Sequence, residues 1–329
     1  MKAAWYEKIG SAEEVLEIGE APIPDIKPNE VLIRLHTSGV NPSDVKMRRG
    51  IREKMPFPQI IPHSDGAGII EKVGAEISHN RIGQRVWTYN ARWQRAFGTA
   101  AEFVVLPAAL AIPLPDVVSF EAGACLGIPA LTAHRCVFVD GNIEGKTVLV
   151  TGGAGSVGYY AIQFAKWGGA TVIATVSNPE KARYAKEAGA DYILNYRKDN
   201  IVEKVHTLTD NKGVDHIVEV DFGRNLAVTQ DILKLNGSVA TYASMGNPNP
   251  ELPFYLFLFR GATFHLVNVY ELPNDARSQA IRDITSLLES NELKHLIAAR
   301  FELKDIVAAH QLVEGGTAIG NVVINVIQE

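Results

Sequence analysis

The segment IPHSDGAG, residues 61–68, places a histidine, a serine and an aspartate directly before two closely spaced glycines. The side chains of His63 and Asp65 are of the types that bind metals or transfer protons. The same residues also fit a polar turn, so their role depends on the residues that surround them. A metal site, a catalytic base and a structural turn are therefore the three interpretations of this segment.

A second segment, GAGSVG at residues 153–158, matches the pattern G-x-G-x-x-G through Gly153, Gly155 and Gly158. It follows the apolar run TVLV (147–150) and precedes a helical pattern, which is the context in which the pattern binds a dinucleotide. The glycines permit a tight turn, and the helix N-terminus offers N–H groups to a pyrophosphate. The segment predicts a dinucleotide site, with a ligand-free turn as the alternative.

The residues after the next two strands indicate which dinucleotide is expected. A site for NAD would carry Asp or Glu about 20 residues beyond the glycines. This chain has Ser177 and Asn178 there, followed by Lys181, and Tyr196 and Arg197 follow the third strand. Hydroxyls and cations suit a 2′-phosphate, so NADPH is the expected cofactor. A solvated helix residue is the alternative for Lys181.

The sequence pattern that predicts the secondary structure around these residues changes along the chain. Up to about residue 123, short β-rich runs alternate with Pro and Gly, which predicts an irregular β domain of the small-barrel type. From residue 147, apolar strands alternate with helices, which predicts a parallel, doubly wound sheet. Ser119 is a candidate helix N-cap between these zones. The terminal strand NVVINVI resembles the first zone and is expected to return to it. The expected domains are 1–123, completed by 268–329, and 124–267.

Composition excludes several classes of protein. The chain has 329 residues, of which 47% are hydrophobic, as in an ordinary folded protein. Its formal net charge of −5 argues against nucleic acid as the main partner, because phosphate binding needs a basic face. The apolar stretch PFYLFLF (253–259) is too short to cross a membrane. Cys125 and Cys136 are too few for a disulfide framework, and no secretory signal is visible. A cytoplasmic protein with no membrane or nucleic-acid partner is expected.

Several further segments resemble one family along essentially the whole chain. They are GVNPSD (39–44), PHSDGAGII (62–70), GQRV (83–86), the glycine turn, EKARYAKEAGADYILNY (180–196) and GNVVINV (320–326). With these segments the chain resembles the medium-chain dehydrogenase/reductase superfamily, in its zinc-free quinone oxidoreductase (zeta-crystallin-like) branch. The resemblance implies an α/β protein with a GroES-like β-rich catalytic domain and a Rossmann cofactor domain. It also implies an active-site cleft between these domains and a homodimer built through the cofactor domain.

The resemblance assigns roles to individual residues. Asn41 and Asp44 match a polar pair that lines the nicotinamide cleft. Lys46 and Arg52 stand where better-known members carry tyrosines, and Lys46 is a candidate proton donor, as are Tyr89 and water. Cofactor contacts are expected from Thr132, Gly153, Gly155, Ser156, Val157, Gly158, Ser177, Lys181, Tyr196, Tyr242, Ser244 and Asn321. Tyr89, Trp93 and Phe264 are candidate walls of the substrate pocket, with core packing as the alternative.

The resemblance also bears on the metal. Zinc-bound members carry Cys at the position of Asn41 and His at the position of Ser64, and a catalytic zinc needs about three protein ligands. Neither ligand is present, so no metal is expected, and residual zinc binding through His63, Asp65 and Cys125 is the alternative.

Without a Lewis acid, hydride transfer is easier to a conjugated acceptor than to an unactivated carbonyl. The first expected function is therefore an NADPH-dependent quinone oxidoreductase. An NADPH-dependent enone or 2-alkenal double-bond reductase and a non-catalytic NADPH-binding sensor, structural or RNA-binding protein are the alternatives.

Overall fold

The protein is described from a computed structural model that covers residues 1–51 and 55–327. It divides into two compact units, Met1–Ile128 with Ile284–Glu329, and Pro129–Asp283. These bounds differ from the expected ones, since residues 124–128 belong to the first unit and residues 268–283 to the second. The backbone N–H of Ile128 donates to Asp65 of the first unit, and the Asp283 carboxylate contacts His134 of the second.

The first unit contains a seven-stranded sheet in the order β14-β15-β3-β4-β5-β7, with β6 paired to the other part of β3. Its strands are β3 (Glu30–Val40), β4 (Asp65–Val73), β5 (Arg85–Thr88), β6 (Phe103–Pro107), β7 (Ala111–Pro113), β14 (Ile297–Glu302) and β15 (Asn321–Asn325). A separate antiparallel pair is formed by β1 (Lys2–Trp5) and β2 (Glu17–Glu20). The terminal strand β15 pairs antiparallel with β3, which confirms that it returns to the first zone.

Alternating apolar residues of β3 point into the core of this unit. Val31, Ile33 and Leu35 of β3 face one fully buried cluster with Ile70 and Val86. The long strand β3 pairs with β4, β6 and β15. The helices of this unit are α1 (Ala12–Val15), α2 (Pro42–Arg48), α3 (Phe120–Gly123) and α11 (Ile306–Glu314), with 3₁₀ turns η1 (His79–Arg81), η2 (Ala108–Leu110) and η5 (Leu303–Asp305). Ser119 caps α3 by accepting from the N–H of Ala122.

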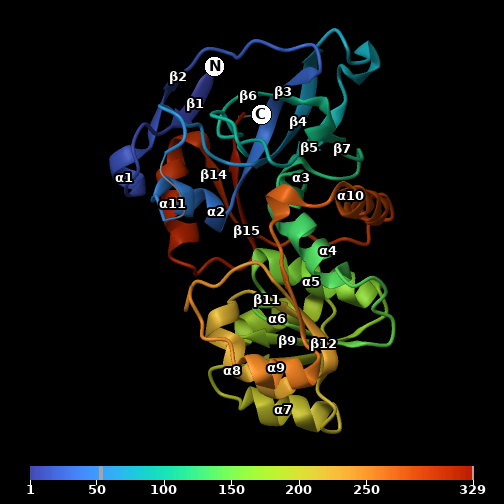
Figure 1. Ribbon diagram of the computed structural model, residues 1–329. Helices are drawn as coiled ribbons and strands as arrows, with labels where there is room; N and C mark the ends of the chain where they lie inside the picture. The colour runs from blue at the N-terminus through green and yellow to red at the C-terminus, as the bar shows by residue number, and fades with distance from the viewer. Residues whose placement is uncertain (52–54, 328–329) are drawn as a thin grey trace. The chain divides into compact units, whose positions relative to one another are not determined.

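The second unit holds a six-stranded parallel sheet in the order β10-β9-β8-β11-β12-β13. Figure 1 labels its strands β9, β11 and β12. The strands are β8 (Thr147–Val150), β9 (Thr171–Val176), β10 (Tyr192–Asn195), β11 (Val214–Glu219), β12 (Leu233–Thr241) and β13 (Thr263–Leu266). β9 and β11 are buried over nearly their whole length, as strands covered on both faces are. This sheet and the β-rich first unit confirm the expected fold class.

Helices connect these strands and cover the sheet. They are α4 (Leu131–Phe138), α5 (Ser156–Trp167), α6 (Pro179–Glu187), α7 (Ile201–Leu208), α8 (Phe222–Ile232), α9 (Phe254–Arg260) and the 3₁₀ turn η4 (Val269–Glu271). The π-helical turn η3 (Leu126–Ala130) and helix α10 (Asn274–Glu289) run across the two unit boundaries. Over the described ranges no helix is both long and apolar enough to cross a membrane.

Candidate active site and cofactor turn

The segment IPHSDGAG enters β4 through an unusual backbone turn at His63, whose φ is 75°. The His63 ring is fully buried, and both of its nitrogens have partners. Nδ1 lies 2.8 Å from Ser38 Oγ, and Nε2 lies 2.9 Å from Nε2 of His310 on α11. A ring with both nitrogens engaged in this way holds the entry of β4 in place.

A backbone carbonyl sets the direction of these hydrogen bonds. Thr99 Oγ1 lies 2.6 Å from the carbonyl of Asp65, which can only accept, so Thr99 donates to it. Ser38 Oγ lies 2.8 Å from Thr99 Oγ1 and therefore donates to Thr99 and accepts from Nδ1–H of His63. Nε2 of a neutral His63 then accepts from Nε2–H of His310. The chain of donors thus assigns the tautomers of both histidines.

The protonation of this pair follows from its burial. Removal from water lowers the pKa of His63 to about 3. Burial lowers the pKa of His310 well below its usual range, and the nearby His63 and Arg48 lower it further. Both rings are therefore neutral at pH 7, as the tautomer assignment requires.

Helix α2 begins at the second polar segment, GVNPSD. The Asp44 carboxylate accepts from the backbone N–H of Asn41 at 2.8 Å and so caps the helix. The Asn41 side chain donates to Asp65 Oδ2 at 2.7 Å, and this oxygen also accepts from the N–H of Ile128. The Asn41 amide thus joins the segment GVNPSD to the segment IPHSDGAG.

Both carboxyl groups beside Asn41 are buried, which changes their acidity. Burial raises the pKa of Asp44 to about 7, and it raises the pKa of Asp65 well above its usual range. Burial thus disfavours the charged form of Asp65, and Asp44 can give or take a proton near pH 7. The carboxyl group of Asp65 fits against the Cα of Gly127, where a Cβ would meet Oδ1 at 2.0 Å.

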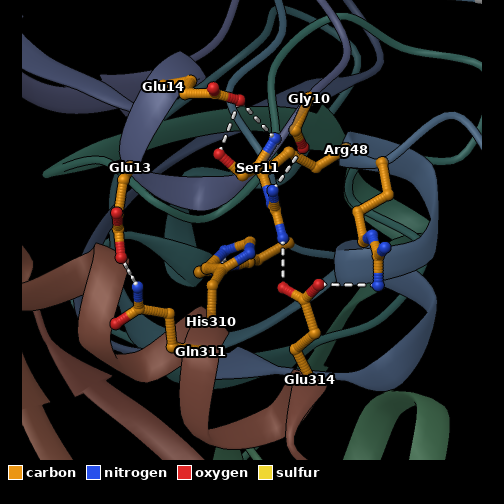
Figure 2. Close-up of polar contacts among 10 residues, drawn as sticks. Gly10, Ser11, Glu13, Glu14, Arg48, His310, Gln311 and Glu314 are labelled. Carbon is orange, nitrogen blue, oxygen red and sulfur yellow. Dashed lines mark hydrogen bonds and ion pairs between the residues drawn. The ribbon is translucent and has the colours of Figure 1, made fainter.

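Helix α11 anchors both polar segments (Figure 2). The Arg48 guanidinium at the end of α2 is fully buried and donates to Glu314 Oε2 at 2.7 Å and to the carbonyl of Gly10. Arg49 reaches the other oxygen of Glu314 at 2.7 Å. One turn earlier on α11, His310 contacts His63. Glu314 and His310 thus fix α2 and the start of β4 to one helix.

The structure bears directly on the zinc alternative. His63 bonds Ser38 and His310, and Cys125 Sγ donates to the carbonyl of Glu121 at 3.2 Å. Burial also raises the pKa of the Cys125 thiol, which disfavours the thiolate that a metal requires. Over residues 1–51 and 55–327, no group of three His, Cys, Asp or Glu side chains is arranged to hold a metal ion.

The glycine turn of the second unit lies between β8 and α5, as its pattern predicts. Gly155 is the N-cap of α5, and a Cβ there would meet only the carbonyl of Gly152, at 3.3 Å. At Gly158 a Cβ would meet the same carbonyl at 2.3 Å, and at Gly153 it would press on side chains of α5 and β9. Packing thus requires Gly153 and Gly158, whereas a Cβ at Gly155 would have a single close neighbour at the helix N-terminus, where N–H groups can bind a phosphate group.

A pocket of about 360 Å³ lies beside this turn, at the carboxyl ends of β8 and β11. The strand order reverses between these two strands, which is where parallel sheets of this type bind dinucleotides. Thr151, Gly152 and Tyr196 contribute to the lining, with Glu219 and Arg224 on the side of β11 and α8. The pocket therefore includes one of the expected 2′-phosphate residues, Tyr196.

Glu219 is a residue of this pocket that sequence reasoning missed. It is fully buried, and its Oε1 accepts from Thr151 Oγ1, the N–H of Asp221 and the amide of Asn225. Its Oε2 has no hydrogen-bond partner among the described residues. An orphaned buried oxygen in the lining of a pocket fits a site that a polar ligand completes.

The remaining expected cofactor residues lie as follows. Ser156 and Val157 form the first turn of α5, and Thr132 is buried in α4. Ser177 is buried at the end of β9, and Lys181 lies in the first turn of α6, whose N-cap is Asn178. Tyr242 follows β12, and Ser244 already donates to the carbonyl of Asn247. Asn321 lies in the first unit, where its side chain donates to the carbonyl of Leu296.

The three candidate wall residues of the substrate pocket, Phe264, Tyr89 and Trp93, differ in burial and in contacts. Phe264 packs edge-on against Phe222 and Phe257, which favours the core-packing alternative for this residue. Tyr89 is buried beside Trp87 and donates to a backbone carbonyl, which also favours core packing. Trp93 is half-buried in the loop after β5. Lys46 lies on α2, and Arg52 falls outside the described residues.

Comparisons with known proteins agree with this architecture. A family model described as "Alcohol dehydrogenase GroES-like domain" matches residues 27–116, and one described as "Zinc-binding dehydrogenase" matches residues 156–286. Human quinone oxidoreductase is 28% identical over 330 residues, which cover 98% of this chain and 97% of that protein.

Two solved structures are similar over nearly the whole chain. The structure of Escherichia coli quinone oxidoreductase complexed with NADPH has a TM-score of 0.88 and 25% identity, and it covers 99% of this chain and 100% of that one. An NAD-dependent alcohol dehydrogenase has a TM-score of 0.89 and 28% identity at the same coverage. These matches support an assignment to the medium-chain dehydrogenase/reductase superfamily, in its quinone oxidoreductase branch.

The buried pair predicts a pH dependence of stability. The folded-state pKa of His63 is depressed, so the unfolded chain binds more protons below pH 6.5, and stability falls as the pH drops from about 6.5 towards 3. We expect the stability advantage of the wild type over His63→Asn to shrink by about 1.4 kcal/mol per pH unit in this range. Asn tolerates a positive φ, and urea unfolding between pH 7 and pH 5 measures the difference.

The wild type must be compared with His63→Asn at each pH, because Asp44 changes the stability of both proteins with pH in the opposite direction from His63. The raised pKa of Asp44 makes the folded state hold a proton that the unfolded state loses, so stability falls as the pH rises from about 4 to about 7. His79→Asn, on the exposed η1 turn, is the control. A wild-type advantage over His63→Asn that is constant with pH would show that His63 is not a buried neutral ring.

Proposed function

We propose that the protein is an NADPH-dependent quinone oxidoreductase that works without zinc. The observation that carries this proposal is the glycine turn at the N-terminus of α5, beside a pocket at the strand-order reversal. Human and E. coli quinone oxidoreductases are similar along the whole chain, and the E. coli enzyme was solved with NADPH. These relatives support both the reaction and the cofactor.

The residues present fit the cofactor. Bound NADPH supplies the hydride. The N-terminus of α5 would hold the pyrophosphate, and Ser177, Lys181 and Tyr196 would hold the 2′-phosphate. No Asp or Glu follows β9 at Ser177 and Asn178, which argues against the NAD preference named for one similar structure.

The catalytic domain would orient the acceptor rather than activate it with a metal. The amide of Asn41 is held by Asp65, so its direction is fixed before substrate arrives. The Asp44 carboxyl, whose pKa is raised to about 7, is a proton source at neutral pH, with Lys46 as a second candidate. A reduced quinone also takes protons from water, so catalysis does not depend on one dedicated acid.

Acceptor preference tests the function. We expect rapid NADPH oxidation with 1,4-benzoquinone and 1,4-naphthoquinone, slower oxidation with 2-alkenals and none with saturated aldehydes. NADH should give a kcat/KM at least about 10-fold lower, because it lacks the phosphate. Faster turnover of alkenals would favour the double-bond reductase. An absence of turnover despite NADPH binding would favour the sensor.

Substitution at the glycine turn tests the cofactor site. Gly155→Val should fold, because only one carbonyl lies near the new Cβ, but its side chain would occupy the phosphate position. We expect NADPH to bind at least about 100-fold more weakly, measured by fluorescence titration. Gly158→Ala is the contrast, because its clash with the carbonyl of Gly152 should lower Tm instead. Unchanged NADPH affinity in Gly155→Val would place the cofactor elsewhere.

We further propose that the protein is a cytoplasmic homodimer that pairs through its cofactor domain. β13 is an edge strand of the parallel sheet, and its Leu266 is 81% exposed. Phe254, Tyr255 and Phe259 of α9 are also largely exposed. An open strand edge next to large exposed apolar side chains favours a self-complementary interface around a two-fold axis.

The double variant Leu266→Lys/Phe259→Glu should convert a dimer of the 35.8 kDa chain into a monomer, because it places charges at this face. Light scattering after size exclusion measures the mass, and Val117→Lys, at an exposed position of the first unit, is the control. A double variant that stays dimeric would exclude this interface.

A further inference from the structure

The loop that follows β5 carries a buried arginine, Arg92. Its side chain is 5% exposed, and Nη1 contacts Met47 Sδ on α2 at 2.9 Å. Nε and Nη2 have no hydrogen-bond partner among the described residues. Arg92 thus has two adjacent donors without a hydrogen-bond partner in the described part of the chain.

These two donors form one edge of the guanidinium. Nε–H and an N–H of Nη2 point in the same direction and match the two oxygens of a carboxylate. None of the ion pairs formed by described residues includes Arg92. Arginine keeps its charge in proteins, and a buried charge without a partner is costly. An anionic ligand group would remove this cost.

The loop holds Arg92 in place. Asn90 and Gln94 adopt positive φ angles, and the guanidinium of Arg95 donates to the carbonyls of Asn90 and Ala91. The N–H of Ala91 donates to the carbonyl of Ser64 at 3.0 Å. Arg92 is thus fixed next to the segment IPHSDGAG and against α2, which begins at Asn41.

Asp44 is the nearby carboxyl that interacts electrostatically with Arg92, and it does not complete the edge. Its Oδ2 accepts from the N–H of Asn41, and its pKa is raised to about 7, so it is partly protonated at neutral pH. Tyr6 also interacts electrostatically with Arg92. Burial raises the pKa of Tyr6 to about 12, so this side chain stays neutral. Neither group makes a hydrogen bond to the Nε–Nη2 edge.

We propose that the Nε–Nη2 edge of Arg92 binds a carboxylate group of the acceptor, so that the preferred substrate is a carboxylated quinone. This inference rests on the proposed quinone oxidoreductase function and deepens it by naming the substrate class. The carboxylate would anchor the acceptor beside Asn41 and leave the conjugated ring to receive the hydride.

The test compares a 1,4-naphthoquinone that carries a carboxymethyl side chain with its methyl ester. The methylene spacer keeps the electronic properties of the two rings similar, so a difference reports recognition of the charge. We expect the wild type to use the acid with a kcat/KM at least about 10-fold above that of the ester. Arg92→Lys keeps the charge but loses the edge and should remove most of this preference. Arg34→Lys, on the half-exposed surface of β3, is the control.

Each outcome decides the proposal. Equal use of acid and ester by the wild type overturns it, even where Arg92→Lys fails to fold. Equal losses for acid and ester in a folded Arg92→Lys, with normal Tm and NADPH affinity, also overturn it. Inhibition by inorganic phosphate as strong as that by the unreactive 1-naphthylacetate would exclude a specific carboxylate site. If no quinone is reduced, the proposed function fails. Calorimetry of 1-naphthylacetate with the NADPH-saturated wild type and Arg92→Lys then still tests Arg92 by itself.

Discussion

The buried guanidinium of Arg48 fixes the helix on which the catalytic proposal depends. Its ion pair with Glu314 joins α2 to α11, and the contact between His63 and His310 joins the start of β4 to the same helix. Removing one partner of a buried ion pair costs about 3–5 kcal/mol, because the other charge is left unsolvated. The distance between Asn41 and Asp65 therefore depends on contacts made by a helix from the last part of the chain.

The histidine pair and the carboxyl groups show how burial selects protonation states. Burial disfavours the imidazolium forms of His63 and His310, and the chain through Ser38 and Thr99 needs only neutral groups. Burial likewise raises the pKa of Asp65, although its Oδ2 accepts two hydrogen bonds. The segment around Ser64 is thus held by the hydrogen bonds that His63 and Asp65 make.

The sequence predicted the elements whose patterns are local. The strands from β8 to β13, the turn at Gly155 and the N-cap at Ser119 follow from apolar periodicity and from glycine and serine chemistry at short range. The return of the terminal strand to the first zone was also expected from its residue pattern, whereas its partner β3 is known only from the structure. The second unit ends at residue 283 rather than at the predicted residue 267. This boundary lies inside helix α10, where the sequence pattern does not change.

By itself, the sequence determined the fold class, the cofactor turn and the absence of zinc-type residues at Asn41 and Ser64, because each depends on residue types at short spacing. Only the tertiary structure decided what His63, Arg48 and Arg92 do. Their partners, or the lack of partners, come from segments up to 266 residues away, as with Arg48 and Glu314. No local pattern records such a contact, since burial and hydrogen-bond satisfaction are properties of the packed chain.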